Sequence, residues 1–176
     1  ITELEHELLE MGEKVHEDHL TGILNRRGLD SVFERETSRS VRHNVPLCFA
    51  LLDIDNFKLL NDTHGHKAGD DALIYMVESI KETTRPEDVV SRYGGEEFVI
   101  LLPNTGLKEA VMILYRVRRS LTKKFFLHEN NRLLITFSAG IAQFKAGESQ
   151  ESLFKRADAA LYRAKKNGKN QILVAD

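Results

Sequence analysis

Residues 88–102 read DVVSRYGGEEFVILL, in which two short apolar stretches flank a pair of glycines. This pattern predicts strands over 88–93 and 97–102. A tight turn is expected at Gly94 and Gly95, because glycine readily adopts the positive φ angles that such turns use. The sequence therefore places a β-hairpin in the middle of the chain.

Helices and strands alternate on both sides of this hairpin. Helices are expected near 26–43, 68–84, 107–123 and 150–167, and further strands near 46–54, 133–144 and 171–174. Gly69 and Asp70 mark the expected start of the second helix, and Gly168 the end of the last. The order predicts an α+β fold, ferredoxin-like or nucleotidyl-cyclase-like, with a central antiparallel sheet flanked by helices that lie largely on one face.

Residues 1–17 carry a heptad pattern ahead of this fold. Its apolar positions are Ile1, Leu4, Leu8, Met11 and Val15. The pattern predicts a coiled-coil-like signalling helix. An amphipathic helix packed on its own domain is the alternative, because two heptads are short and Gly12 weakens a helix. Turn-forming residues interrupt the pattern from Asp18 onward, so we expect a helical stub over 1–17 and one domain over 18–176.

The composition excludes several functional classes. Charged residues make up 30% of the 176 residues and the formal net charge is -2, which indicates neither disorder nor a nucleic-acid-binding surface. Cys48 is the only cysteine, so no internal disulfide forms, as is typical of a cytoplasmic domain. No stretch is long and apolar enough to span a membrane, and we expect no membrane contact by this part. Because the chain starts without Met, we expect a piece of a longer protein that could carry a sensor or a membrane anchor.

Carboxylates follow two of the predicted strands. Asp53 and Asp55 end the apolar strand near 46–54, and Glu96 and Glu97 follow the glycine pair. If the two strands are neighbours, Asp53 lies beside Glu96, and two carboxylates with substrate phosphates make a typical site for Mg²⁺ or Mn²⁺. Alternation along a strand sends Glu96 and Glu97 to opposite faces, so only one of them is expected to bind the metal directly. Ordinary loop carboxylates are the alternative for the aspartate pair.

A polar loop over 61–70 lies between the two carboxylate pairs. Asp70 either caps the following helix or recognises guanine, since a carboxylate accepts from the N1–H and N2–H₂ groups that adenine lacks. Asn61 can add an amide contact. Guanine recognition and helix capping both stay open for Asp70 at this point.

Basic residues are available for an anionic ligand. Lys58, Lys165 and Lys169 can neutralise a triphosphate, although solvated surface lysines are the plainer interpretation. Arg85 and Asp88 frame a short loop ahead of the hairpin, where a surface ion pair is the plain explanation.

Two ordered motifs resemble the GGDEF family of diguanylate cyclases. They are DIDNFKLLNDTHGHKAGD at 53–70 and RYGGEEF at 92–98. Shorter matches extend the resemblance from about residue 18 to the end, and these are DHLTGILNRR at 18–27, SAGIA at 138–142 and ADAALYRAKKNGKN at 157–170. The signature reads GGEEF, which keeps a carboxylate at its third position. Lys169 stands where many members have arginine, which keeps the charge but loses a bidentate phosphate contact.

The resemblance implies an enzyme that condenses two GTP into cyclic di-GMP, releases two pyrophosphates and works as a homodimer in which each domain holds one GTP. It implies the following site: Asp53, Glu96 and Glu97 for catalysis; Asp53, the Ile54 carbonyl and Glu96 for the metal; Asn61 and Asp70 for guanine; Lys58, Lys165 and Lys169 for phosphates; Phe57, Gly94 and Gly95 as pocket walls. Arg85 and Asp88 resemble the family's inhibitory site for cyclic di-GMP. Arg116 is the candidate for a further arginine there, with Arg39 of a neighbouring domain as another.

Two other functions are considered. A domain with this fold could be a receptor for cyclic di-GMP or GTP without synthesis, which the intact Asp53, Glu96, Asn61 and Asp70 argue against. An RNA-binding ferredoxin-like module would need exposed aromatic side chains on its central strands and a basic face, and the sequence shows neither.

Overall fold

The chain, seen in a computed structural model, is described for residues 2–176, apart from the side chains of 12–14. The helices are α1 (Glu3–Val15), α2 (Arg26–His43), α3 (Phe57–His64), α4 (His66–Thr83), α5 (Leu107–Lys123) and α6 (Gln150–Lys166). The strands are β1 (Leu47–Ile54), β2 (Val89–Arg92), β3 (Glu97–Pro103), β4 (Phe126–His128), β5 (Asn131–Leu133), β6 (Phe137–Gln143) and β7 (Ile172–Val174). The main sheet has the order β2-β3-β1-β6-β7, antiparallel except for the β6–β7 pair, and β4 and β5 form a separate hairpin. The predicted α+β fold is confirmed.

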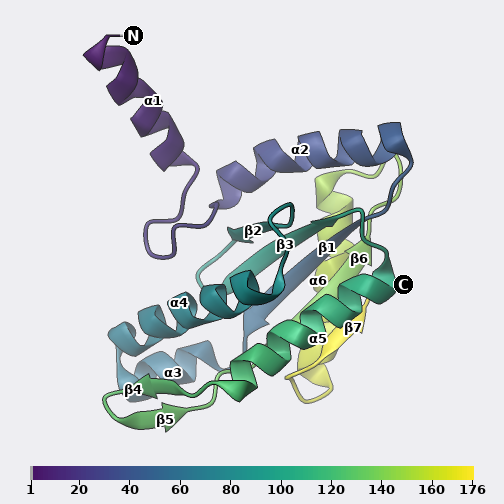
Figure 1. Ribbon diagram of the computed structural model, residues 1–176. Coiled ribbons are helices and arrows are strands. Elements are labelled where there is room, and N and C mark those ends of the chain that lie inside the picture. Colours follow the sequence, from purple (N-terminus) through teal and green to yellow (C-terminus); the bar gives the residue numbers. More distant parts are fainter. Residues whose placement is uncertain (1) are drawn as a thin grey trace.

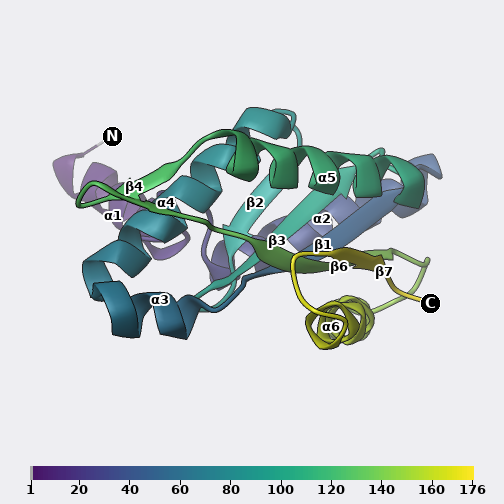
Figure 2. The same ribbon diagram turned by 90° about the horizontal axis from the view of Figure 1, so that it is seen from below.

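Helices cover both faces of the main sheet. Helices α4 and α5 lie on one face, and α6 lies on the other (Figures 1 and 2). Helix α2 shares the α6 face, because its Leu29 and Phe33 pack with Phe49 and Leu51 of β1. The expectation that the helices lie largely on one face is therefore wrong. The strand β1 is apolar throughout its middle because it is buried on both faces. With helices on both sides of it, the sheet offers no open face for the RNA-binding alternative within the described residues.

The polar segment expected as a loop is mostly helical. Helix α3 ends at His64, and α4 begins directly after Gly65, which has a φ of 91°. The start predicted at Gly69 and Asp70 is therefore wrong, and Asp70 is not a helix cap. Gly69 has a packing role instead, because a Cβ placed there would lie 1.8 Å from Asn61 Oδ1. Glycine at this position allows α3 and α4 to approach closely.

Two turns also differ from expectation. The glycines of the β2–β3 hairpin have no positive φ, because the connection spans residues 93–96 and is longer than a two-residue turn. The strand expected near 133–144 is divided between β5 and β6. Its first part folds back on β4 through Glu129 and Asn130, whose φ angles are 50° and 66°. The resulting hairpin packs on α4 through Phe126 and Tyr75, whose ring centroids are 5.4 Å apart.

Helix α1 projects away from the domain (Figure 1). Its apolar side chains are exposed, with Leu4 at 66%, Leu8 at 59% and Met11 at 62%. The alternative of a helix packed on its own domain is thus wrong for the described residues, while the coiled-coil interpretation stays a prediction. Within residues 2–176, none of the helices is both long enough and apolar enough to cross a membrane.

Gly140 of β6 provides a test of the packing between the sheet and α6. A Cβ at this position would lie 2.0 Å from the Ala157 carbonyl oxygen and 2.5 Å from the Leu161 nitrogen, both in the helix backbone. We expect Gly140→Ala to lower the free energy of unfolding by about 3 kcal/mol, measured by urea denaturation. Gly95→Ala is the matched control, because nothing lies within 4 Å of a Cβ added there. Equal stability of the two variants would contradict this account of the packing.

Candidate functional site

The two carboxylate pairs come together where β1 lies beside β3. Asp53 of β1 is the register partner of Glu97 at the start of β3, and the Ile54 N–H donates to the Glu96 carbonyl at 3.2 Å. The N–H and C=O of one strand residue point to the same side, so the Ile54 carbonyl also faces the hairpin. Glu96 lies in the turn before β3, outside the strand. The rule that successive side chains of a strand point to opposite faces therefore does not apply to Glu96 and Glu97. The expectation that the two glutamates point to opposite faces for this reason is wrong.

Asp53, Glu96 and Glu97 lie close together where β1 ends and β3 begins, and the pKa of each carboxyl is raised. Burial is the main cause that raises the pKa of Glu96, and the nearby charge of Asp53 raises it further. Burial and the charge of Asp53 likewise raise the pKa of Glu97. Burial also raises the pKa of Asp53, although a hydrogen bond from Lys165 opposes the shift. A cation placed among these groups would be stabilised by all three of them.

Lys165 supplies one such cation from α6. Its Nζ donates to Asp53 Oδ2 at 2.6 Å, and its side chain is 38% exposed. Asp158 lies seven residues earlier on the same helix, and its charge adds to the rise in pKa of Asp53 and Glu97. Asp158 was not expected from the sequence. Its spacing from Lys165, which places both on one face of a helix, was the signal that could have found it.

Asp55 has a different role from Asp53. Its carboxylate accepts from Thr136 Oγ1 at 2.7 Å, Ser138 Oγ at 2.6 Å and the Asn170 backbone N–H at 2.9 Å. These bonds join the end of β1 to the start of β6 and to the loop after α6. Asp55 is therefore a positioning residue, a role that the sequence did not indicate. The loop that it holds carries Lys169, whose Nζ donates to Asn56 Oδ1 at 2.6 Å.

The residues expected to bind guanine lie on α3 and α4, together with Lys58, one of the three lysines expected to bind phosphates. Phe57 begins α3 and packs partly against the core, and Lys58 beside it is exposed. Asn61 Oδ1 is buried and has no hydrogen-bond partner among the described residues. An unpaired buried acceptor costs about 1–3 kcal/mol, so a ligand that donates here would be favoured. Asp70 is exposed on α4, one residue after the glycine that Asn61 contacts.

The turn with the glycine pair is held from outside by Arg92. Its Nε and Nη2 donate to the Gly95 carbonyl at 3.1 and 2.8 Å, and its Nη1 donates to Asp18 Oδ1 at 3.2 Å. Asp18 in turn accepts from the Thr21 hydroxyl at 2.6 Å. Sequence reasoning assigned no role to Arg92 or Asp18 beyond the resemblance. The structure shows that they join the start of the domain to the turn.

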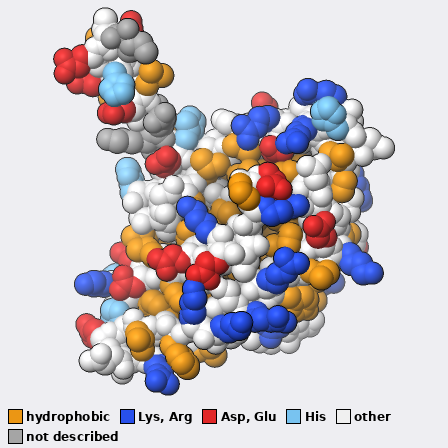
Figure 3. Space-filling view, viewed as in Figure 1, with side chains coloured by type: hydrophobic (Ala, Val, Ile, Leu, Met, Phe, Trp, Pro, Cys, Tyr) orange, Lys and Arg blue, Asp and Glu red, His pale blue; other side chains and the backbone are white. Residues whose placement is uncertain are grey.

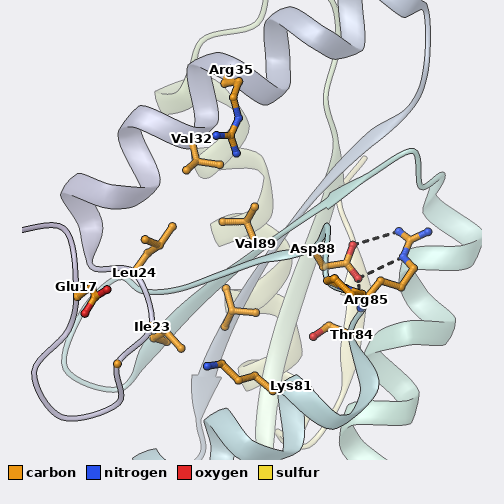
Figure 4. Close-up of a pocket in the computed structure, with 13 residues that line it drawn as sticks. Glu17, Ile23, Leu24, Val32, Arg35, Lys81, Thr84, Arg85, Asp88 and Val89 are labelled. Carbon is orange, nitrogen blue, oxygen red and sulfur yellow. Dashed lines mark hydrogen bonds and ion pairs between the residues drawn. The ribbon is translucent and has the colours of Figure 1, made fainter. Parts of the chain in front are cut away.

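Arg85 and Asp88 bond to each other, and because Asp88 is buried they are not a simple surface ion pair. The Asp88 side chain is 0% exposed, and its oxygens accept from the Arg85 backbone N–H at 2.8 Å and from Nη2 at 3.1 Å (Figure 4). Asp88 is thus occupied, and a guanine that used it would first have to exchange with Arg85. The guanidinium is turned toward α5, where it also donates to the Pro103 carbonyl at 3.1 Å and lies 3.9 Å from Glu109.

Arg116 lies on α5, seven residues after Glu109 and hence on the same face of that helix. Figure 3 shows Lys and Arg side chains gathered over α5. Arg39 is exposed on α2, and no contact of its side chain with Arg85 or Asp88 is found in the described part of the chain. The structure therefore supplies an argument for Arg116 beside Arg85 and none for Arg39 within one subunit.

The carboxylates where β1 ends and β3 begins could supply part of the ligands of a metal ion, with a substrate supplying the rest. Among the described residues, no cluster of three or more His, Cys, Asp and Glu is arranged to hold a metal ion alone. Mg²⁺ uses one or two carboxylates and completes its shell with water and substrate phosphates, so two of these carboxylates would be enough to hold it. Burial and the charge of Asp53 raise the pKa values of Glu96 and Glu97, and a divalent cation beside them would favour their charged forms.

Comparison with known proteins gives matches along nearly the whole chain. The family model "Diguanylate cyclase, GGDEF domain" matches residues 15–171. Diguanylate cyclase DgcP of Pseudomonas aeruginosa is 42% identical over 163 residues, which are 93% of this chain and 24% of that protein. The chain therefore spans about a quarter of the length of this relative.

Solved structures agree with these matches. The coiled coil and GGDEF domain of DgcB from Caulobacter crescentus, in complex with c-di-GMP, gives a TM-score of 0.91 at 32% identity over 98% of this chain and 92% of that one. The active GGEEF domain of a diguanylate cyclase from Vibrio cholerae gives 0.79 at 33% identity over 86% of this chain and 97% of that one. The chain belongs to the GGDEF family of diguanylate cyclase domains.

Proposed function

We propose that this chain is a diguanylate cyclase that condenses two GTP into cyclic di-GMP and releases two pyrophosphates. One observation supports the proposal most directly in a chain of this family. The carboxylates of Asp53, Glu96 and Glu97 lie together where β1 ends and β3 begins, and Lys165 is bonded to Asp53 there. In each of two steps the 3′-oxygen of one GTP forms a bond to the α-phosphorus of the other. The bond from that phosphorus to pyrophosphate breaks, and the hydroxyl proton passes to a base.

Asp53, the Ile54 carbonyl and Glu96 would hold Mg²⁺ or Mn²⁺. When bound, such an ion polarises the α-phosphate and lowers the pKa of the attacking hydroxyl. Glu97 is suited to accept the proton, because its carboxylate lies beside Asp53, at the same end of the strands as Glu96.

The basic and amide side chains would bind and orient the nucleotide. Lys165 would exchange Asp53 for a phosphate once a metal occupies the carboxylates, and Lys58 and Lys169 would approach the same phosphates. The backbone at Gly95 offers room for them, since nothing lies within 4 Å of a Cβ placed there, whereas a Cβ at Gly94 would lie 3.1 Å from Glu97 Oε1. Phe57 would form a wall of the guanine pocket.

One such site holds one GTP, so two copies must face each other for the reaction. Helix α1 supports a homodimer, because its exposed leucines need a partner to cover them. Of the related structures, DgcB is described as a coiled coil with its GGDEF domain. Helix α1 would bring two domains together in the same way and raise their local concentration.

The direct test is turnover of GTP in the presence of Mg²⁺, measured by chromatography at several protein concentrations. We expect the wild-type chain to yield cyclic di-GMP, and Glu96→Gln to lose at least about a hundredfold in rate, since the change removes a charged metal ligand at constant volume. Glu78→Gln on the outer side of α4 is the matched control and should keep wild-type turnover. A wild type that leaves GTP unchanged would indicate a receptor, and an active Glu96→Gln would refute the metal assignment.

Asp70→Asn tests guanine recognition. The amide places a donor opposite the N–H groups of guanine, and leaving such donors unpaired costs about 1–3 kcal/mol each, so we expect GTP affinity to fall about tenfold or more by calorimetry. Asp62→Asn, on the exposed surface of α3, should leave the affinity unchanged. Because Asp70 lies inside α4 and is not a cap, the fold should tolerate the change. Equal affinities of the two variants would remove Asp70 from the guanine site.

We further propose that Arg85 and Arg116 bind cyclic di-GMP and thereby inhibit the enzyme. Arginine donates bidentately to guanine O6 and N7 and to phosphate oxygens, and Asp88 orients Arg85 toward α5. Bound product would fix two domains so that their half-sites cannot meet, which is a shift of population and not competition with GTP.

Arg85→Ala should therefore keep initial turnover but accumulate several times more product before the rate stalls. Arg163→Ala, which removes from α6 a guanidinium that donates to the Val174 carbonyl of β7, serves as the control. Progress curves of cyclic di-GMP formation measure both variants. If Arg85→Ala stalls at the wild-type product concentration and binds the product equally well, the inhibitory site lies elsewhere.

A further inference from the structure

A cavity of about 550 Å³ lies along β2, away from the carboxylate edge (Figure 4). This volume is within the range of small-molecule sites in proteins. Its walls come from five segments, namely the linker between α1 and α2, helix α2, the end of α4, the loop over 84–88 and strand β2. Arg85 and Asp88 belong to that loop, but the Arg85 guanidinium points toward Pro103 and Glu109, so the cavity is not the α5 side of Arg85.

Two cationic side chains reach into this cavity from opposite sides. Arg35 extends from α2 and Lys81 from the last turn of α4 (Figure 4). Arg35 Nε has only Glu36 Oε1 near it, at 3.5 Å, and no ion pair of Lys81 is found among the residues described. Two carboxylates also line the cavity. Asp88 is already paired with Arg85, and Glu17 lies on the far side beside Leu24 in Figure 4.

The strand edge adds a backbone donor between these cations. β2 is the edge strand, and its Arg92 N–H points outward to the Leu24 carbonyl at 2.8 Å, whereas the Tyr93 N–H points inward to Glu97 at 2.8 Å. Because direction alternates along a strand, the Val90 N–H points outward like that of Arg92. The linker runs along β2 at Leu24 and turns away at Gly22, whose φ is 75°. No carbonyl of the described linker accepts a hydrogen bond from the Val90 N–H.

We propose that this cavity binds an organic anion with an apolar body. The acidic group, a carboxylate, sulfonate or phosphate, pairs with Arg35 or with Lys81, one at each side of the cavity, and the Val90 N–H is a further donor in the cavity wall. The body lies against the apolar walls formed by Ile23, Val32 and Val89. Hydrogen bonds to a charged group are about twice as strong as neutral ones, and the apolar walls exclude water from them. Such a ligand joins α2, α4 and the linker, and so stabilises the folded domain by mass action.

The proposal is independent of catalysis and is tested by binding. The probe is 8-anilinonaphthalene-1-sulfonate, with the neutral N-phenyl-1-naphthylamine as a matched compound without the acidic group. In fluorescence titrations we expect the Arg35→Ala/Lys81→Ala double variant to bind the sulfonate at least about tenfold more weakly than wild type. The neutral compound should bind both proteins alike. Arg119→Ala, which removes a cation from the outer surface of α5, should keep wild-type affinity.

Amide chemical shifts locate the probe and separate this site from exposed apolar surface. The sulfonate should shift the amides of Val90 and Ile23 in wild type and not in the double variant, whose fold is checked by circular dichroism. Equal sulfonate affinity in the double variant would overturn the proposal. Shifts confined to exposed residues such as Leu59 and Leu134, which are 63% and 75% exposed, would also overturn it.

Discussion

The antiparallel pairing of β1 with β3 is the constraint on which the rest of the structure depends. Its register sets Asp53 opposite Glu97, and it runs unbroken to the pair of Leu47 with Pro103. Both strands are buried on two faces by large apolar side chains. A shift of one residue would exchange the residues facing α4 and α5 with those facing α2 and α6, so packing strongly disfavours any other register. The apolar core thereby determines where the carboxylates meet.

This register brings three acidic groups together and partly buries them, which makes their charged forms less stable. The carboxylates of Asp53, Glu96 and Glu97 all have raised pKa values, with burial as the main cause. The bond from Lys165 to Asp53 offsets part of the repulsion in the free domain. Partial burial disfavours the charge of Lys165, but that bond and the surrounding carboxylates raise the pKa of its amine. Lys165 is thus a cation that already lies among these carboxylates in the free domain, held by its bond to Asp53.

Much of this could be predicted because it is local. Apolar runs predicted β1 and β3, and their adjacency brought Asp53 near Glu96. What failed depends on contacts between distant segments. Gly69 resembles a helix start in the sequence, yet it is required because Asn61 approaches it from α3. Asp55 looks equivalent to Asp53 until the hydroxyls of Thr136 and Ser138, at the start of β6 and more than eighty residues later, are placed against it. The cavity along β2 is formed by five separate segments, and only the loop with Arg85 and Asp88 carried a signal in the sequence.

The linker between α1 and α2 connects these features. Asp18 holds Arg92, and Arg92 holds the carbonyl of Gly95 beside Glu96, so the start of the domain is tied to the catalytic turn by charge-assisted hydrogen bonds. Leu24 of the same linker pairs with the edge of β2, and Gly22 to Leu24 line the cavity. Helix α1 projects away from the domain and is joined to it by this linker (Figure 1). A change in the position of α1 would therefore move the linker before the rest of the domain. The linker therefore joins α1 both to the hydrogen bonds of Arg92 at the hairpin turn and to the wall of the cavity along β2.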